Sequence, residues 1–318
     1  MTSPSQTIPM TADPSLSPSA GAVASTAADV SRLIRPRIAV MVLATVATAA
    51  WLTAGQSLDG AALAVVLLGT LLVAASSSIA NQIVERHTDR LMPRTAARPL
   101  VTGRMGVRDA WILSAGLLVA GLVITVAGGG WAASAASLST WLLYVLVYTP
   151  LKRVTPLNTA VGAIAGALPV AIGWCAAGGP GRLVAGDAAS GIAAGALATV
   201  LYLWQFPHFM AIAWLYRRQY SDAGLKMLTV VDPGGLRAAG QALAAALAMV
   251  PVSLLLAVPS ASVWMFLVAA TASVAYVAAT VRFAVARDDT SARGLLMVSL
   301  ASLAAILVAA VACGGPPS

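Results

Sequence analysis

The 318-residue chain is too apolar to be a soluble protein. Hydrophobic residues make up 59% of it, charged residues only 9%, and its mean hydropathy is +0.87. Globular domains carry about 25% charged residues, so these values exclude a soluble enzyme, and they also exclude disorder over most of the chain. The apolar runs are long and do not alternate as the strands of a membrane barrel would. They predict an all-α, polytopic membrane protein.

Nine apolar segments are long enough to span a membrane as helices, which takes about 20 residues. The segments are residues 38–55, 61–82, 109–127, 131–149, 157–177, 188–210, 237–258, 261–282 and 294–313. The third and fourth are separated only by residues 128–130, three glycines that predict a tight turn because glycine adopts positive φ without penalty. The chain is thus expected to form a nine-helix bundle over residues 31–318, after a Ser-, Thr-, Ala- and Pro-rich disordered tail at 1–30.

The lysines and arginines are concentrated in the loops that the predicted spans place on one side of the membrane. The formal net charge is +8, and every lysine and arginine except Arg182 falls on the cytoplasmic side when the N-terminus is cytoplasmic. This is the pattern of the positive-inside rule, so it predicts a multi-pass protein of the plasma or inner membrane with an external C-terminus, and no nucleic-acid partner. Two cytoplasmic loops, residues 83–108 and 211–236, are long and hold acids and bases together. The active site is therefore expected on the cytoplasmic side.

The first of these loops follows a polar helix end. Asn81, Glu85 and Asp89 are spaced four residues apart, which places them on one face of a helix. Three oxygen ligands suit a hard cation such as Mg²⁺, which is usually completed by substrate phosphates. Arg94 and Arg98 follow, and arginine binds phosphate through a bidentate fork. The combination predicts a diphosphate site; the alternative is an interfacial helix end whose charges are only solvated.

Three more polar residues lie near the cytoplasmic ends of the fourth and fifth spans. Lys152 and Arg153 follow the fourth span, and Asn158 begins the fifth. They are either further contacts to a diphosphate or, for the two charges, positive-inside anchors. Gly162 and Gly166 in the fifth span form a GxxxG pair, which either allows close helix packing or clears space for a flat or isoprenoid substrate.

The sixth span carries polar residues inside an apolar run. Trp204, Gln205 and His208 stand together around Pro207, which is expected to kink the helix. Polar side chains at membrane depth are costly and tend to be functional; the alternative for His208 is a satisfied packing residue. In the loop that follows, Asp222 is the best placed acid for a second Mg²⁺ site.

These motifs resemble a known family. The run from Asn81 to Leu100 is similar to the first motif of the protoheme IX farnesyltransferases, or haem O synthases, which are UbiA-type intramembrane prenyltransferases. Four further blocks, in order, resemble the same family: Tyr148-Thr149-x2-Lys152-Arg153, Gly166-x2-Pro169-x3-Gly173-Trp174, Trp204-Gln205-x-Pro207-His208-Phe209 and Ala223-Gly224-x2-Met227-Leu228. The resemblance covers about residues 35–313. One departure is Gln219, where the family usually has an acid; Asp222, one turn on, is the expected substitute.

The resemblance implies a nine-helix bundle that transfers a farnesyl group from farnesyl diphosphate to a vinyl group of haem B, giving haem O. We therefore assign Mg²⁺ to Asn81, Glu85 and Asp89, with Asp222 added on its spacing alone, and diphosphate to Arg94, Arg98, Lys152, Arg153 and Asn158. His208, with Gln205 and Trp204, is the expected haem contact, through iron or a propionate. Besides the lipid bilayer, haem A synthase or oxidase assembly factors are expected partners. Two alternatives stay open: a UbiA-type enzyme for a quinone-precursor or chlorophyll-type acceptor, and a haem-handling transporter.

Overall fold

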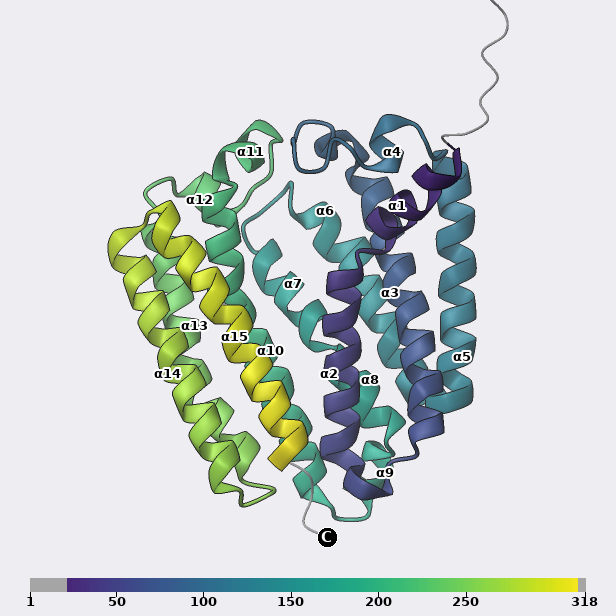
Figure 1. Cartoon of the computed structure of the whole chain (residues 1–318), viewed down its shortest axis with the longest axis vertical. Coiled ribbons are helices and arrows are strands. Elements are labelled where there is room, and N and C mark those ends of the chain that lie inside the picture. Colours follow the sequence, from purple (N-terminus) through teal and green to yellow (C-terminus); the bar gives the residue numbers. More distant parts are fainter. Residues whose placement is uncertain (1–21, 314–318) are drawn as a thin grey trace, which may run out of the picture.

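The computed structural model describes residues 22–313, and within that range the chain is helical with short connections and contains no strand. Most helices run side by side along the long axis of the molecule, while α4, α6, α11 and α12 gather at one end of it (Figure 1). In chain order the helices are α1 (Ala22–Ile34), α2 (Pro36–Ala54), η1 (Gly55–Ser57), α3 (Gly60–Asp89), α4 (Pro99–Thr102), α5 (Val107–Leu142), η2 (Leu143–Tyr148), α6 (Thr149–Leu151), α7 (Asn158–Ala167), α8 (Pro169–Ala176), α9 (Gly179–Val184), α10 (Ala188–Leu215), α11 (Arg217–Asp222), α12 (Leu228–Val231), α13 (Leu236–Leu254), η3 (Leu255–Ala257), α14 (Val263–Ala286) and α15 (Asp289–Cys313).

The all-helical membrane architecture is confirmed. Within the described residues, eight helical runs are long and apolar enough to cross a membrane. They are Pro36–Ser57, Gly60–Asp89, Val107–Leu151, Asn158–Ala176, Ala188–Leu215, Leu236–Ala257, Val263–Ala286 and Asp289–Cys313. The count of nine spans stays a prediction, because two of the predicted spans fall in the single 45-residue run Val107–Leu151.

That long run is broken at Gly130. This residue has φ 76° and ψ 177°, outside the helical region. The hydroxyl of Ser134 donates to the carbonyl of Leu122 at 3.1 Å, although twelve residues of straight helix would separate them by about 18 Å. The chain therefore turns back at Gly130, and the predicted spans 109–127 and 131–149 lie on either side of the turn.

Local signals in the sequence account for several helix starts. Asp59 caps α3 by accepting hydrogen bonds from the backbone N–H groups of Ala61 and Ala62. Prolines at the first position of α2 and α8, Pro36 and Pro169, supply the backbone angle that a helix needs and lack the N–H that would be unpaired there. The predicted fifth span is accordingly divided into α7 and α8 at Pro169.

The N-terminal boundary differs from the prediction. Residues 1–21 of the expected tail lie outside the described residues, but residues 22–30 belong to α1. Arg104 holds this helix through two hydrogen bonds to Asp29, at 2.8 and 2.9 Å, and Gln82 donates to the carbonyls at its C-terminal end. These partners come from distant parts of the sequence, so the local composition of the segment gave no sign of them.

The helices pack as two groups that meet at α10. α2, α3, α5 and α8 pack together, and α10, α13, α14 and α15 form the second group, which supplies most of the largest buried apolar cluster. α10 joins the groups because it also packs against α2 and α7. The two long loops that carry acids and bases meet at the end where α4, α11 and α12 lie (Figure 1), through a cluster in which Met92 packs with Tyr220 and Leu225.

Candidate functional site

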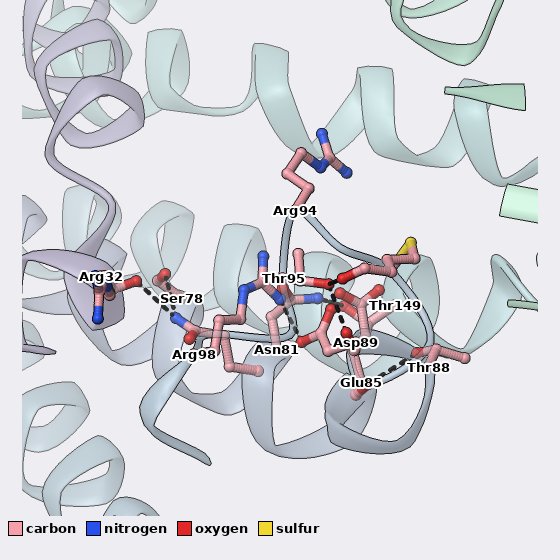
Figure 2. A network of polar contacts seen from close by, with 12 residues as sticks. Arg32, Ser78, Asn81, Glu85, Thr88, Asp89, Arg94, Thr95, Arg98 and Thr149 are labelled. Atoms are coloured by element: carbon pink, nitrogen blue, oxygen red, sulfur yellow. Dashed lines mark hydrogen bonds and ion pairs between the residues drawn. The ribbon is translucent and has the colours of Figure 1, made fainter. Parts of the chain in front are cut away.

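The three polar residues of α3 lie where the sequence places them. Asn81, Glu85 and Asp89 occupy the last turns of this helix and share one face (Figure 2). Asn81 and Asp89 are buried, with 0% and 1% of their surfaces exposed. The site is thus formed by the end of a membrane-spanning helix, and the loops at that end enclose it.

Each carboxylate on α3 is paired with a cation from another segment. Lys152 Nζ donates to Glu85 Oε1 at 2.7 Å, and an Arg98 guanidinium nitrogen donates to Asp89 Oδ2. All four side chains are at most 13% exposed. Burying two charges is costly, and only close pairing compensates for it. The structure therefore brings these four residues together at one place.

This environment shifts the pKa values of the two cationic side chains. Burial lowers the pKa of Lys152, but the Glu85 carboxylate together with Tyr148 and Tyr144 raises it above its ordinary value. Burial lowers the pKa of Arg98, and the nearby charge of Arg35 lowers it further. Arg35 has φ 50°, an uncommon backbone conformation for a residue other than glycine. Arg35 was not among the predicted site residues, although a basic residue directly before Pro36 at a helix start was a visible signal in the sequence.

Asn81 is fixed by a segment distant in sequence. Its amide nitrogen donates to the hydroxyl of Thr149 at 3.0 Å, and that hydroxyl donates to the carbonyl of Tyr144 at 2.8 Å. Tyr144 lies in η2, a π-helical stretch, and such stretches are frequent at functional sites. In the same segment the ring of Tyr148 lies 4.4 Å from Lys152 Nζ. The aromatic residues of η2 therefore lie at the site. They belong to the sequence motif around Tyr148, but their spacing alone did not predict a role for them.

Among the described residues, several side-chain oxygen atoms are buried and have no hydrogen-bond partner, including Thr70 Oγ1 and Gln82 Oε1 of α3, and three of them belong to residues that the motifs single out. These three are Asn81 Oδ1, Asp89 Oδ1 and Gln219 Oε1. An unpaired buried polar atom costs about 1–3 kcal/mol, and such atoms call for an explanation such as a bound ion. Oxygen donors of this kind fit a hard cation such as Mg²⁺.

No metal site made of acidic, histidine or cysteine side chains alone is present in the described part of the chain: no three such side chains are grouped so that they could hold an ion. Asn81 would have to join Glu85 and Asp89, and other oxygen atoms would have to complete the site. This is how Mg²⁺ is usually bound, with few protein carboxylates and several oxygens from water and phosphate.

The predicted acid for a second metal site is not drawn into this group. Asp222 is exposed at the last position of α11, and its carboxylate makes no hydrogen bond or ion pair within residues 22–313. The chain turns away directly after it, at Gly224 with φ 69°. Gln219, by contrast, has its side-chain oxygen buried. The residue that departs from the family pattern therefore points inward, and its expected substitute does not.

The remaining basic candidates differ in position. Arg94 projects from its loop away from the carboxylates (Figure 2). Its guanidinium carbon lies 4.6 Å from the centre of the Tyr216 ring, and its Nη2 donates to Tyr220 Oη at 3.3 Å. It thus joins the two long loops. Arg153 is exposed.

Asn158 links two loops instead of offering a free donor. Its amide nitrogen donates to the carbonyl of Thr155 at 2.7 Å and to that of Lys226 at 3.1 Å. The backbone N–H of Lys226 in turn donates to the carbonyl of Lys152 at 2.7 Å. Both amide protons of Asn158 are occupied, so the structure does not present it to a phosphate as the sequence analysis expected.

The polar residues of α10 lie inside the helix bundle. Gln205 donates to the carbonyls of Ala163 and Leu201, both at 3.0 Å, and a Cβ added at Gly166 would collide with its side chain. The GxxxG pair therefore serves close packing. The Trp204 and His208 rings stack with their centres 4.6 Å apart. The helix continues through Pro207 to Leu215.

Comparison with known proteins agrees with this architecture. The profile of the UbiA prenyltransferase family matches residues 42–303. The chain is 40% identical over 289 residues to a protoheme IX farnesyltransferase of Rhodopirellula baltica, covering 87% of this chain and 96% of that protein. Among solved structures, digeranylgeranylglyceryl phosphate synthase has a TM-score of 0.74 at 15% identity, over 91% of this chain and 99% of the other. A UbiA homolog from Archaeoglobus fulgidus bound to GPP and Mg²⁺ has a TM-score of 0.63 at 18% identity, over 89% and 99%.

Proposed function

We propose that this chain, which belongs to the UbiA prenyltransferase family, transfers a farnesyl group from farnesyl diphosphate to a vinyl group of haem B and forms haem O and diphosphate. The observation that carries the proposal is the end of α3, where two carboxylates, two paired cations and unpaired buried oxygens meet. The choice of haem as acceptor is supported by the relative from Rhodopirellula baltica, whose name states that activity.

The residues of α3 would hold Mg²⁺ through Asn81, Glu85 and Asp89, and the fit rests on the unpaired oxygen atoms of Asn81 and Asp89. When bound, Mg²⁺ supplies positive charge that makes diphosphate a better leaving group. The A. fulgidus homolog, which binds GPP and Mg²⁺, supports a divalent ion in this fold.

The cations of the site would bind the diphosphate oxygens and stabilise their developing charge. Lys152 and Arg98 stand beside the carboxylates and keep their charge in a poorly hydrated place. Arg94, which is exposed and donates to Tyr220, would contact the outer phosphate. As the allylic C–O bond breaks, its electron pair goes to diphosphate, and the π electrons of the haem B vinyl group form the new C–C bond to the farnesyl carbon. Water then adds to the cation left on the other vinyl carbon and loses one proton, which gives the hydroxyl, so the site must exclude water until the C–C bond has formed.

We further propose that the site faces the cytoplasm. The support is the distribution of lysine and arginine, of which only Arg182 lies on the opposite side. The membrane would be the plasma or inner membrane, and the product would pass to an enzyme or assembly factor that uses haem O, such as haem A synthase.

An acceptor assay tests the proposal. Membranes that contain the protein are given farnesyl diphosphate and Mg²⁺ with either haem B or a quinone precursor, and the products are identified by mass spectrometry. Farnesylation of haem B alone supports the proposal. Farnesylation of the quinone precursor alone would assign the chain to another branch of the family.

A further inference from the structure

His208 is held by a residue of α15 that the sequence motifs did not include. Its Nδ1 lies 2.8 Å from the hydroxyl of Ser299. The same hydroxyl lies 2.6 Å from the carbonyl oxygen of Leu296. Ser299 is completely buried, so these two neighbours decide how its single proton is used.

The hydroxyl proton must point to the carbonyl. A carbonyl oxygen accepts and never donates, so at 2.6 Å only a donated proton makes the Ser299–Leu296 contact favourable. The hydroxyl then has only a lone pair left for His208, and Nδ1 must carry the proton of that hydrogen bond. In a neutral imidazole, the other nitrogen, Nε2, is then the acceptor.

Within the described residues, the Nε2 atom of His208 has no hydrogen-bond partner and is not fully enclosed. No carboxylate there pairs with His208 to hold it in the cationic form. The ring orientation is fixed by stacking on Trp204, whose Nε1 donates to the backbone carbonyl of Ser299 at 2.7 Å. Tyr276 of α14 donates to the carbonyl of Trp204 at 2.7 Å.

We infer that Ser299 is a positioning residue that sets the tautomer of His208. As a result, Nε2 of His208 binds the iron of haem B and not a propionate. This inference rests on the proposed haem substrate. A propionate carboxylate requires a donor, and Nε2 has only a lone pair. A metal-ligating histidine typically donates its other N–H to an oxygen that fixes the tautomer and the ring, and losing that oxygen costs about 10- to 100-fold in metal affinity.

Spectroscopy of bound haem B tests the inference. The purified full-length protein in lipid nanodiscs is titrated with haem B, and the iron–histidine stretching band of the ferrous complex is recorded by resonance Raman. We expect the band in the wild type, its absence in His208→Ala, and its return when imidazole is added to His208→Gly. Ser299→Ala is expected to shift the band and to weaken haem binding on the order of 10-fold. Ser299→Thr keeps an acceptor oxygen and is expected to retain the wild-type band and the wild-type haem affinity.

Ser302→Ala is the matched control. Ser302 is also buried on α15, but its hydroxyl donates to the carbonyl of Ala272 and does not touch His208, so this variant should bind haem as the wild type does. An unchanged band in His208→Ala or Ser299→Ala overturns the inference. So does a His208→Ala defect that vanishes with haem dimethyl ester, which lacks free propionates. A parallel haem O assay separates the two claims: haem O formation without iron ligation removes only this inference, and iron ligation without haem O removes only the proposed reaction.

Discussion

Lys152 and Glu85 form an ion pair with 2.7 Å between Nζ and Oε1, although they lie 67 residues apart in the sequence. The pair joins the segment after α6 to the last turns of α3, and the backbone carbonyl of Lys152 also accepts from Lys226 of the second long loop. One lysine therefore connects three segments around the candidate diphosphate site. Its side chain pairs with α3, and its backbone binds the second long loop.

Removing this lysine should destabilise the protein. Lys152→Met leaves Glu85 as an unpaired charge that is 13% exposed, and we expect the free energy of unfolding to fall by up to about 3 kcal/mol. The double variant Lys152→Met/Glu85→Gln, which removes both charges, should recover part of that loss. Thermal unfolding in detergent measures both. Arg218→Met, at an exposed residue of α11, is the control; equal losses in the single and double variants would contradict a paired role.

The stabilisation from Lys152 should also depend on pH in a defined direction. Its pKa in the folded protein is raised above the ordinary lysine value of about 10.4. The stabilisation is therefore fully present below the unfolded-state pKa and is lost as pH rises through the folded-state pKa. The difference in unfolding temperature between wild type and Lys152→Met should stay constant from about pH 6 to about pH 9 and shrink only in more alkaline buffer. A steady decline across neutral pH would speak against the raised pKa.

Gln219 and Asp222 should differ sharply in their effect on metal dependence. Asp222 is exposed, so Asp222→Asn should keep activity within about twofold of wild type, whereas Gln219→Leu, which removes a buried unpaired oxygen, should lower it. Gln219→Glu adds a charge where the oxygen lies and should reduce the Mg²⁺ concentration for half-maximal activity on the order of 10-fold, which equals about 1.4 kcal/mol. Mg²⁺ titrations of prenyl transfer decide this, and a strong defect in Asp222→Asn would restore it as a ligand.

Gly166 should tolerate no side chain. A Cβ there collides with buried Gln205, so Gly166→Ala should cost about 1–3 kcal/mol of stability through overpacking. Gly195→Ala on α10 has open space around the new atom, and it should leave the unfolding temperature unchanged or raise it slightly because alanine favours helix. Equal effects of the two substitutions would show that the close approach of α7 and α10 does not depend on this glycine.

The sequence was sufficient for features that depend on one helix. The spacing of Asn81, Glu85 and Asp89 defines a face of α3 whatever surrounds it, and the three glycines predicted the break at Gly130 because only backbone freedom is involved. Apolar segment length likewise indicated the membrane helices, except that it could not tell that residues 22–30 belong to α1.

Contacts between distant segments were beyond sequence reasoning. Asn158 looked like a phosphate donor by residue type, but the carbonyl of Lys226 occupies it. Asp222 lies one turn from Gln219, yet it is exposed because α11 ends at this residue. Ser299 carries no motif at all and becomes visible only because α15 packs against α10. Spacing along one helix does not determine which segment will face it.

The most direct test of the central claim is haem O formation by the wild type and by Asp89→Asn in the same membranes, with haem B, farnesyl diphosphate and Mg²⁺ supplied. Asp89→Asn keeps the size of a side chain that is 1% exposed but removes its charge. We expect haem O from the wild type and at least about a 100-fold lower rate from the variant, the effect of losing one electrostatic group in a site shielded from water. Equal rates in the two proteins, with both folded and inserted, would contradict a diphosphate site at the end of α3, and no haem O from either would contradict the proposed reaction.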